Sequence, residues 1–189
     1  MKRIILTFLN LFFLSSLVAQ TNCSELFFSE YVEGSSQNKA IEIYNPTSSS
    51  IDLSTYTVER FSNGATNSSS GGVTNLSGII APGDVFVLTH GDTVGGGGFG
   101  AIDPILYSLG DMAAGPYPSP MHMNGNDAIT LTNNGLIIDV IGRVGEDPGT
   151  AWMCDNGAWW TANHTLIRKK TVLIGDYEAL DSFNPTTEW

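Results

Sequence analysis

Hydrophobic and polar residues alternate along a short stretch in the first quarter of the chain. Ile41 and Ile43 fall on one face of an extended segment, and Glu42 and Tyr44 fall on the other. Isoleucine is β-branched and suits a pleated, half-buried surface. The segment ends before Pro46, because proline donates no hydrogen bond to a sheet ladder. The pattern predicts a central strand of a sheet.

Similar short hydrophobic segments, separated by turn residues, recur along the chain. Asn133-Asn134-Gly135 lies between two alternating runs, and Asn-Gly in this position is typical of a tight β-hairpin. Val85–Thr89 is a continuous apolar run, which predicts a strand buried on both faces. About eight strands are expected, at residues 26–32, 40–44, 56–61, 73–76, 85–89, 127–132, 136–141 and 165–168, with a short extended piece at 51–53. Since no helical period is long enough to form a crossover helix, the predicted fold class is all-β, a sandwich of two sheets.

Residues 90–127 are the least regular part of the chain. They contain four consecutive glycines, Gly95–Gly98, and several prolines, and only residues 102–109 have the pattern of a helical turn or two. A stretch of this length without regular structure is uncommon inside a compact domain and is usually functional or flexible. We expect one long Gly/Pro-rich loop, which is an obvious contact element at the end of a sandwich.

The first 19 residues have the pattern of a secretory signal peptide. A positive start at Lys2 and Arg3 precedes the apolar run 4–14, and Leu17–Ala19 supplies small residues for cleavage. The apolar run is shorter than the ~18–20 residues of a membrane-spanning helix. We therefore predict a signal peptide at residues 1–19, a single domain at residues 20–189, and a mature chain that is secreted or held at the cell surface without a membrane span.

The charge of the chain limits its partners. Removing residues 1–19 takes away two basic residues and no acidic one, so the net charge of −11 becomes −13. Such a field repels a phosphate backbone, so direct nucleic-acid binding is disfavoured. One local basic run, Arg168-Lys169-Lys170, either contacts phosphate or forms a solvated strand edge that discourages pairing with another sheet.

Two cysteines, Cys23 and Cys154, are present. In an exported protein they are candidates for one disulfide that ties the start of the chain to a late loop, and two free thiols are the alternative.

Two groups of residues are candidates for metal chemistry. His90 and Asp92 lie two residues apart after a predicted strand and are candidate ligands of a divalent metal, although neither His122 nor His164 has a spacing that adds a further ligand. Glu30, Glu33 and Glu42 lie on or near neighbouring strands and are candidates for acid–base work or calcium binding. For both groups the alternative is ordinary loop residues or solvated charge, so no metal or cofactor is assigned. Calcium is the one ion that stays a candidate.

Other candidate contacts are aromatic. Trp152, Trp159 and Trp160 are able to stack on bases or sugars, and the alternative is a place in the core or in a lid. Trp159 and Trp160, with Arg168 and Lys169, are therefore the candidate ligand contacts. No Gly-x-Ser-x-Gly elbow and no Cys–His pair at useful spacing is present, so no catalytic residue is assigned.

The order of several segments resembles a known family. Phe28–Gly34, Ala40–Pro46 and Ile51–Leu53 resemble the opening of a lamin tail domain. Further segments that match in order are Ile80–Val87, Gly125–Leu131, Ile138–Gly142, His164–Lys169, Phe183–Pro185 and Glu188–Trp189. The resemblance covers nearly all of the predicted mature chain.

The resemblance implies an immunoglobulin-like sandwich without catalytic residues of its own. In bacteria it implies an accessory module on exported hydrolases, often of the nuclease or phosphoesterase type. Because the chain ends at Trp189, where the family would continue into a catalytic domain, we expect either a fragment of a secreted nuclease or a module that stands alone. The predicted function is thus a secreted, non-catalytic module that binds a protein or surface partner or positions a hydrolase in cis or trans. The alternatives are a stand-alone adhesion or carbohydrate-binding module and a small metal-dependent phosphoesterase.

Overall fold

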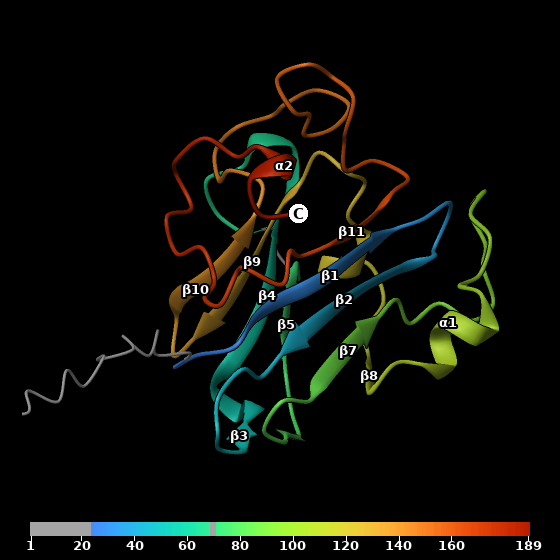
Figure 1. Cartoon of the computed structure of the whole chain (residues 1–189). Coiled ribbons are helices and arrows are strands. Elements are labelled where there is room, and N and C mark those ends of the chain that lie inside the picture. Colours follow the sequence, from blue (N-terminus) through green and yellow to red (C-terminus); the bar gives the residue numbers. More distant parts are fainter. Residues whose placement is uncertain (1–23, 69–70) are drawn as a thin grey trace, which may run out of the picture.

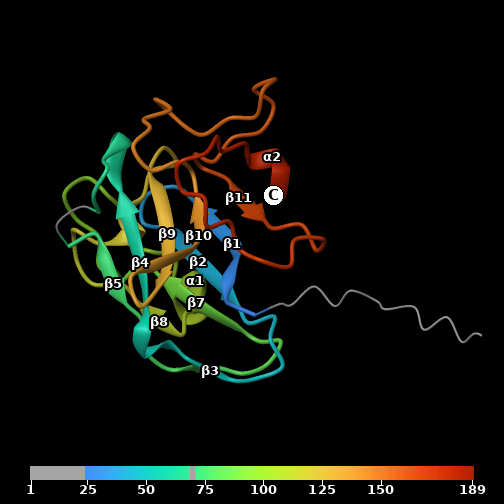
Figure 2. The same ribbon diagram turned by 90° about the vertical axis from the view of Figure 1, so that its left-hand side faces the viewer.

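The computed structural model describes residues 24–68 and 71–189, which form an immunoglobulin-like β-sandwich of two main sheets (Figures 1 and 2). The first sheet has the order β11-β1-β2-β7-β8, and the second has the order β10-β9-β4-β5. The strands of the first sheet are β1 (Phe27–Glu33), β2 (Lys39–Tyr44), β7 (Val85–Thr89), β8 (Met112–Ala113) and β11 (Thr165–Ile167). Those of the second are β4 (Tyr56–Phe61), β5 (Val73–Asn75), β9 (Ala128–Asn133) and β10 (Leu136–Ile141).

The remaining elements are short. β3 (Ile51–Asp52) pairs with β6 (Ile79–Ile80), and every strand pair is antiparallel except β7 with β8. The helices of the described residues are α1 (Pro104–Ser108), α2 (Pro185–Glu188) and the 3₁₀ turns η1 (Leu53–Thr55), η2 (Ser62–Gly64) and η3 (Pro120–His122). The predicted all-β class is confirmed.

The strand expected at the centre of a sheet is β2, which lies between β1 and β7. Ile41 and Ile43 have no exposed surface and face the second sheet, while Glu42 and Tyr44 are half-buried on the opposite face. The core between the sheets joins these isoleucines to residues such as Val58 from β4. Alternation along β2 therefore supplies one wall of the core, as its sequence predicts.

The predicted hairpin is also present. β9 and β10 are joined by Asn134 and Gly135, whose φ angles are 50° and 77°. A two-residue hairpin loop of type I′ requires positive φ at both central positions, and Asn and Gly adopt it at low cost. The local sequence therefore fixes this connection.

Two expectations are corrected, one about the strand at residues 85–89 and one about the segment 90–127. Val85–Thr89 is not buried on both faces: Phe86 and Leu88 face the core, but on the outer face Val85 is 36% exposed and Val87 is half-buried. Residues 90–127 are not structureless, because they include α1, β8 and η3. Asp103 caps α1 by accepting hydrogen bonds from the backbone of the first turn.

Some predictions concern residues outside the described ranges. The predicted signal peptide and Cys23 lie there, and Cys154 is a buried free thiol in this structure. The disulfide between the two cysteines, the signal peptide and the domain limits therefore stay predictions. Among residues 24–68 and 71–189, no helix has the length and apolar character needed to cross a membrane.

Candidate functional site

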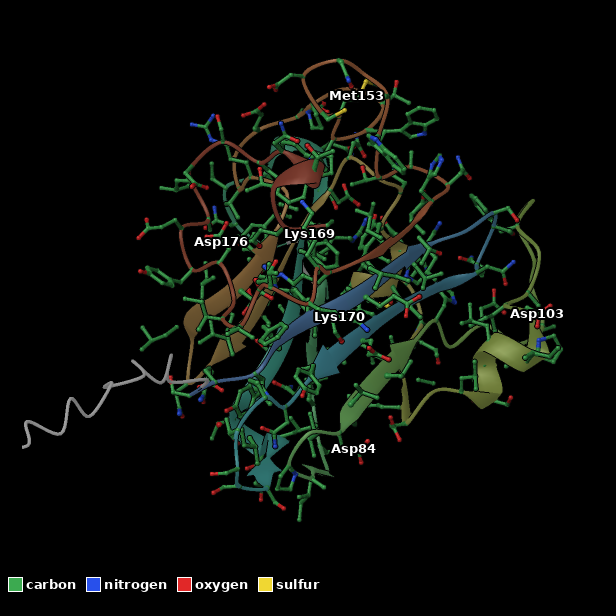
Figure 3. All side chains as sticks on the ribbon, viewed as in Figure 1. Asp84, Asp103, Met153, Lys169, Lys170 and Asp176 are labelled. Atoms are coloured by element: carbon green, nitrogen blue, oxygen red, sulfur yellow. The ribbon has the colours of Figure 1, made fainter. Side chains whose placement is uncertain are left out.

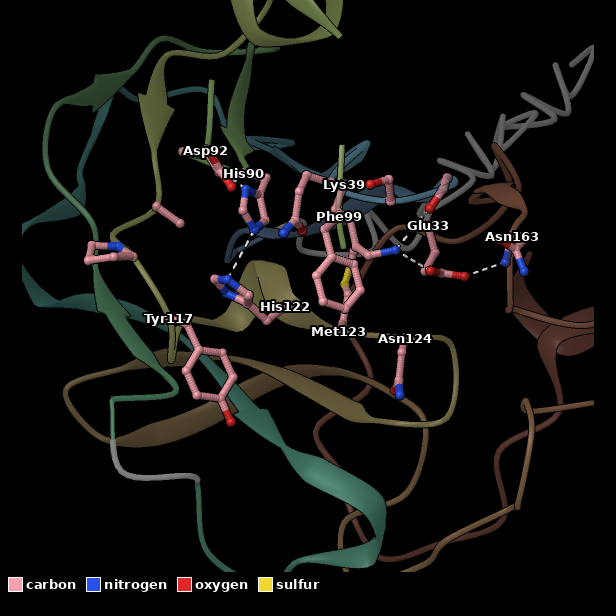
Figure 4. Close-up of a pocket in the computed structure, with 16 residues that line it drawn as sticks. Glu33, Lys39, His90, Asp92, Phe99, Tyr117, His122, Met123, Asn124 and Asn163 are labelled. Carbon is pink, nitrogen blue, oxygen red and sulfur yellow. Dashed lines mark hydrogen bonds and ion pairs between the residues drawn. The ribbon is translucent and has the colours of Figure 1, made fainter. Parts of the chain in front are cut away.

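A pocket of about 900 Å³ opens at one end of the sandwich, where three loops meet (Figure 4). The loops are the β1–β2 connection, the segment after β7 and the segment from β8 through η3. Gly91 allows two of them to approach, because a Cβ atom at this position would lie 2.1 Å from the carbonyl oxygen of Ala114. The lining residues are Glu33, Gly34, Ser36, Gln37, Lys39, His90, Gly91, Asp92, Phe99, Ala114, Pro116, Tyr117, His122, Met123, Asn124 and Asn163.

A buried ion pair lies in the pocket wall. Glu33 and Lys39 are cross-strand partners at the ends of β1 and β2, and their side chains form a salt bridge (Figure 4). Lys39 Nζ also donates to the carbonyl oxygen of Gly34 at 2.9 Å, and Glu33 accepts from the backbone N–H of Asn163. Both charges are thereby satisfied within the protein, as burial requires.

Two histidines contact each other beside this ion pair. His90 Nε2 and His122 Nε2 lie 3.2 Å apart, and the two rings are edge to face. His90 Nδ1 accepts a hydrogen bond from the backbone N–H of Asp92 at 3.0 Å, so in the neutral ring the proton is on Nε2. His90 therefore donates to His122, and His122 Nδ1 in turn donates to Ser119 Oγ at 2.8 Å. This chain of donors assigns one tautomer to each ring.

Both rings are neutral at neutral pH. Burial, followed by the neighbouring His122, lowers the pKa of His90 to about 4. Burial, followed by the charge of Arg60, also lowers the pKa of His122. Asp92 is ionised, because the backbone N–H groups of Gly95 and Val94 donate to its carboxylate and lower its pKa. The charged groups of the pocket are thus one balanced ion pair and one carboxylate.

The hydrogen bonds disfavour metal ligation at His90 and Asp92. A ligating histidine usually donates its second N–H to a carbonyl or carboxylate. His90 instead accepts a backbone N–H at Nδ1, which leaves Nε2 protonated and without a lone pair for a metal. Within the described part of the chain, no group of three or more His, Cys, Asp and Glu side chains is arranged to hold a metal ion. His90 and Asp92, the candidate metal ligands, therefore gain no support from this geometry.

The three glutamates considered for calcium are divided between two places. Glu30 and Glu42 are cross-strand partners, and burial followed by the charge of Glu42 raises the pKa of Glu30. Glu33 lies in the pocket, where Lys39 neutralises it. The three carboxylates do not converge on one point.

Three carboxamides line the pocket without protein partners. Among the residues that the structure describes, the side-chain amides of Gln37, Asn124 and Asn163 have no hydrogen bond. Gln37 is only 8% exposed, whereas Asn124 and Asn163 are exposed at the mouth. These residues were not predicted, because isolated amides in loops carry no pattern in the sequence.

Two aromatic rings lie at the same mouth (Figure 4). Tyr117 is 74% exposed and Phe99 is 61% exposed. The ring of Tyr117 contacts His122 edge to face, with centroids 5.1 Å apart. The pocket thus combines hydrogen-bonding amides with apolar ring faces.

The predicted basic contacts lie elsewhere. Arg168 is buried, not on a solvated edge: it forms ion pairs with Asp139 and Glu188 and lies beside the rings of Phe27 and Trp189. Although burial alone lowers the pKa of Arg168, Asp139 and Glu188 raise it, so the charge is kept.

The next two residues of the basic run differ from Arg168. Lys169 donates to the carbonyl oxygens of Thr186 and Thr187, and both Lys169 and Lys170 lie beside β1, well away from Asp103 at α1 (Figure 3). The run is therefore not one continuous basic surface.

The three candidate tryptophans do not lie in one environment either. Trp152 is buried, and its indole N–H donates to the carbonyl oxygen of Asp127 at 3.3 Å. Trp159 and Trp160 are exposed on the loop that also carries Met153, and neither lines the pocket. Ligand contact by Trp159 and Trp160 stays a prediction.

The fold and the pocket define an immunoglobulin-like β-sandwich whose candidate site lies among the loops at one end. A family model, the lamin tail domain, matches residues 19–145, and the chain belongs to this family. No curated protein and no solved structure matches the chain. Residues after the match belong to the same sandwich, because β11 pairs with β1. Asn163, which also follows the match, lines the pocket.

Proposed function

We propose that the chain is an exported, non-catalytic lamin tail module that binds a ligand or surface partner at the pocket end of its sandwich. In this role it positions a hydrolase of the nuclease or phosphoesterase type, carried on the same polypeptide or on a partner. Membership of the lamin tail domain family and the start of the sequence, which has the pattern of a signal peptide, support the proposal. The loop end of a rigid sandwich is a common place for such contacts.

The state of the ionisable groups in the pocket carries the proposal. Glu33 is held by Lys39 and by a backbone N–H, and His90 is held between Asp92 N–H and His122. None of these groups is left as a free base or nucleophile facing the cavity, as turnover would require. The groups that are free to make contacts are amides and aromatic rings, which suit binding.

The net charge favours a partner other than nucleic acid. The chain carries a net charge of −11, and two residues of its basic run, Arg168 and Lys169, already contact protein groups. Phosphate backbones gain little from such a surface. A hydrolase that acts on nucleic acid would then bring its own substrate-binding residues, and this module would anchor it elsewhere.

A turnover assay tests the non-catalytic part of the proposal against the metal-dependent phosphoesterase. The full chain is incubated with DNA, RNA and a chromogenic phosphodiester, each with added magnesium, calcium or zinc. We expect no turnover above that of the metal alone. Turnover by the wild-type chain that is lost in a His90→Gln, His122→Gln double variant of unchanged stability would overturn the proposal.

Export is tested separately. The full chain is produced in a bacterium and its location and amino terminus are determined. Cleavage after Ala19 and recovery outside the cytoplasm are expected from the signal-peptide pattern. Retention of Met1 in the cytoplasm would contradict this part of the proposal.

A further inference from the structure

We infer that the ligand of the pocket is a neutral glycan, bound through hydroxyl groups on the three free amides and through a sugar face on Tyr117 or Phe99. This inference rests on the proposed binding function of the same pocket and names the chemical class of its ligand.

Charge in the pocket disfavours an anionic ligand. Lys39, the cation of the pocket wall, is paired with Glu33 and donates to the carbonyl oxygen of Gly34. Both histidines are uncharged at neutral pH, each with one ring N–H, and Asp92 adds a negative charge. A phosphate or carboxylate would meet no free positive charge here and would face a carboxylate, whereas an uncharged ligand meets neither penalty.

The free amides match hydroxyl groups. A carboxamide has two N–H donors and a carbonyl acceptor, and a sugar hydroxyl both donates and accepts, so each amide is able to satisfy one or two hydroxyls. Gln37 is the strongest indication, because the residue as a whole is only 8% exposed, lines the pocket and has no side-chain hydrogen bond among the described residues. The Gln37 amide atoms are not among the fully enclosed polar atoms without a hydrogen bond, so they are open to the pocket, where a ligand hydroxyl is able to replace water as their partner.

The two rings supply the apolar half of the site. One face of a pyranose ring presents C–H groups, and such a face packs on an aromatic ring while the hydroxyls at the ring edge reach polar groups. Tyr117 and Phe99 are exposed at the mouth, and the ring of Tyr117 contacts His122 edge to face (Figure 4). The pocket volume of about 900 Å³ lies within the ~300–1,000 Å³ range of sites for small molecules.

The position of the pocket favours a glycan over an extended peptide. Peptides commonly bind sandwiches by adding a strand to an open sheet edge. This pocket lies at the ends of β1, β2 and β7, and β2 has a neighbour on each side. Its free groups are side-chain amides rather than a row of backbone N–H and C=O groups.

The inference is tested by titrating the full chain, labelled with ¹⁵N, with four neutral oligosaccharides: cellohexaose, maltohexaose, laminarihexaose and chitohexaose. A galacturonate oligomer and a dinucleotide serve as anionic probes. We expect saturable binding of at least one neutral probe, with backbone amide shifts concentrated at residues 34–39, 90–99, 117–124 and 163. Neither anionic probe should bind as tightly.

Variants locate the contacts. Tyr117→Ala and Gln37→Leu should each weaken binding by about tenfold or more in calorimetry. Tyr177→Ala is the matched control, because Tyr177 is 64% exposed and does not line the pocket. Thermal melting of each variant shows that a loss of binding is not a loss of folding.

Several results would overturn the inference. They are no saturable binding of any neutral probe, tighter binding of an anionic probe, or binding that Tyr117→Ala and Gln37→Leu leave unchanged while a Trp159→Ala, Trp160→Ala double variant abolishes it. A peptide that shifts the same pocket residues would refute the glycan and leave the proposed binding function intact. Turnover in the assay described above would instead refute the proposed function itself.

Discussion

A largely buried residue with a carboxamide side chain flanks each end of β2, and the hydrogen bonding of the two amides is opposite. After β2, Asn45 has no exposed surface and its amide donates to the carbonyl oxygens of Ser49, Ile80 and Ala81 at 2.8, 3.0 and 3.1 Å. Its carbonyl oxygen accepts from the backbone and the hydroxyl of Thr47. Before β2, Gln37 is nearly as buried but its amide has no partner among the described residues.

The difference separates polar groups that hold the fold from polar groups that are available to a ligand. Asn45 joins β2 to the turn after β6, and its hydrogen bonds replace those that the carbonyls would lose on leaving water. The buried Arg168 belongs to the same class, since its guanidinium forms ion pairs with Asp139 and Glu188. Gln37 belongs to the other class, together with Asn124 and Asn163.

The largest expected effect is at Arg168. Arg168→Ala should lower the free energy of unfolding by about 3–5 kcal/mol, because it leaves the carboxylate of Asp139 buried without its cation. Lys170→Ala, two residues away, is the control and should stay within about 0.5 kcal/mol, because no ion pair joins Lys170 to the described residues. Denaturation in urea measures both variants, and equal losses would place Arg168 among the surface charges.

A smaller loss is expected at Asn45. Asn45→Ala removes the donor shared by three carbonyl oxygens and should cost about 1–3 kcal/mol. Asn75→Ala offers a comparison on an exposed side chain and should change stability by no more than about 0.5 kcal/mol. If the two variants unfold at the same urea concentration, the hydrogen bonds of Asn45 do not stabilise the fold.

A more gradual effect is expected from the histidine pair on acidification. Unfolded His90 takes up a proton near pH ~6.5, whereas folded His90 stays neutral down to a pKa of about 4. The unfolded chain therefore binds more protons in this window, and the free energy of unfolding falls as the pH decreases through it. Above the window the two states bind protons equally at this group, so the contribution is constant.

The acid effect is assigned to His90 by a variant that keeps its hydrogen bond. His90→Asn retains an acceptor for the backbone N–H of Asp92 but does not titrate. Unfolding curves between about pH 7 and about pH 4.5 should show a shallower loss for this variant than for the wild-type chain. Parallel curves would mean that His90 is protonated as easily in the folded chain as in the unfolded one.

The parts of the fold that the sequence predicts are those encoded locally. The alternation of Ile41 and Ile43 identifies β2, and Asn134-Gly135 identifies the β9–β10 hairpin, because strand period and turn conformation depend on neighbouring residues. The order of such segments was enough to identify the family. Val85 shows the limit, since whether a strand is covered on its outer face depends on elements distant in the sequence.

The pocket could not be predicted, because it is built from distant contacts. His90 and His122 are 32 residues apart and have no metal-ligand spacing, and they meet only because β8 runs parallel to β7 and leads into η3. The burial of Arg168 is not predictable for a related reason: a basic run is usually solvated, and only the fold brings Asp139 to it. Spacing therefore offers His90 and Asp92 only as weak candidates for a site, while the free amides carry no signal.

The smallest expected change in stability is at Gln37, and it sharpens the comparison with Asn45 most directly. Gln37→Leu keeps the size of the side chain and removes an amide without a partner, so the free energy of unfolding should change by no more than about 0.5 kcal/mol. Urea denaturation beside Asn45→Ala measures the contrast between two amides that flank one strand. A loss as large as that of Asn45→Ala would show that the Gln37 amide stabilises the fold, and it would then not be available to a ligand. A neutral result would agree with an amide that does not stabilise the fold and is available to a ligand.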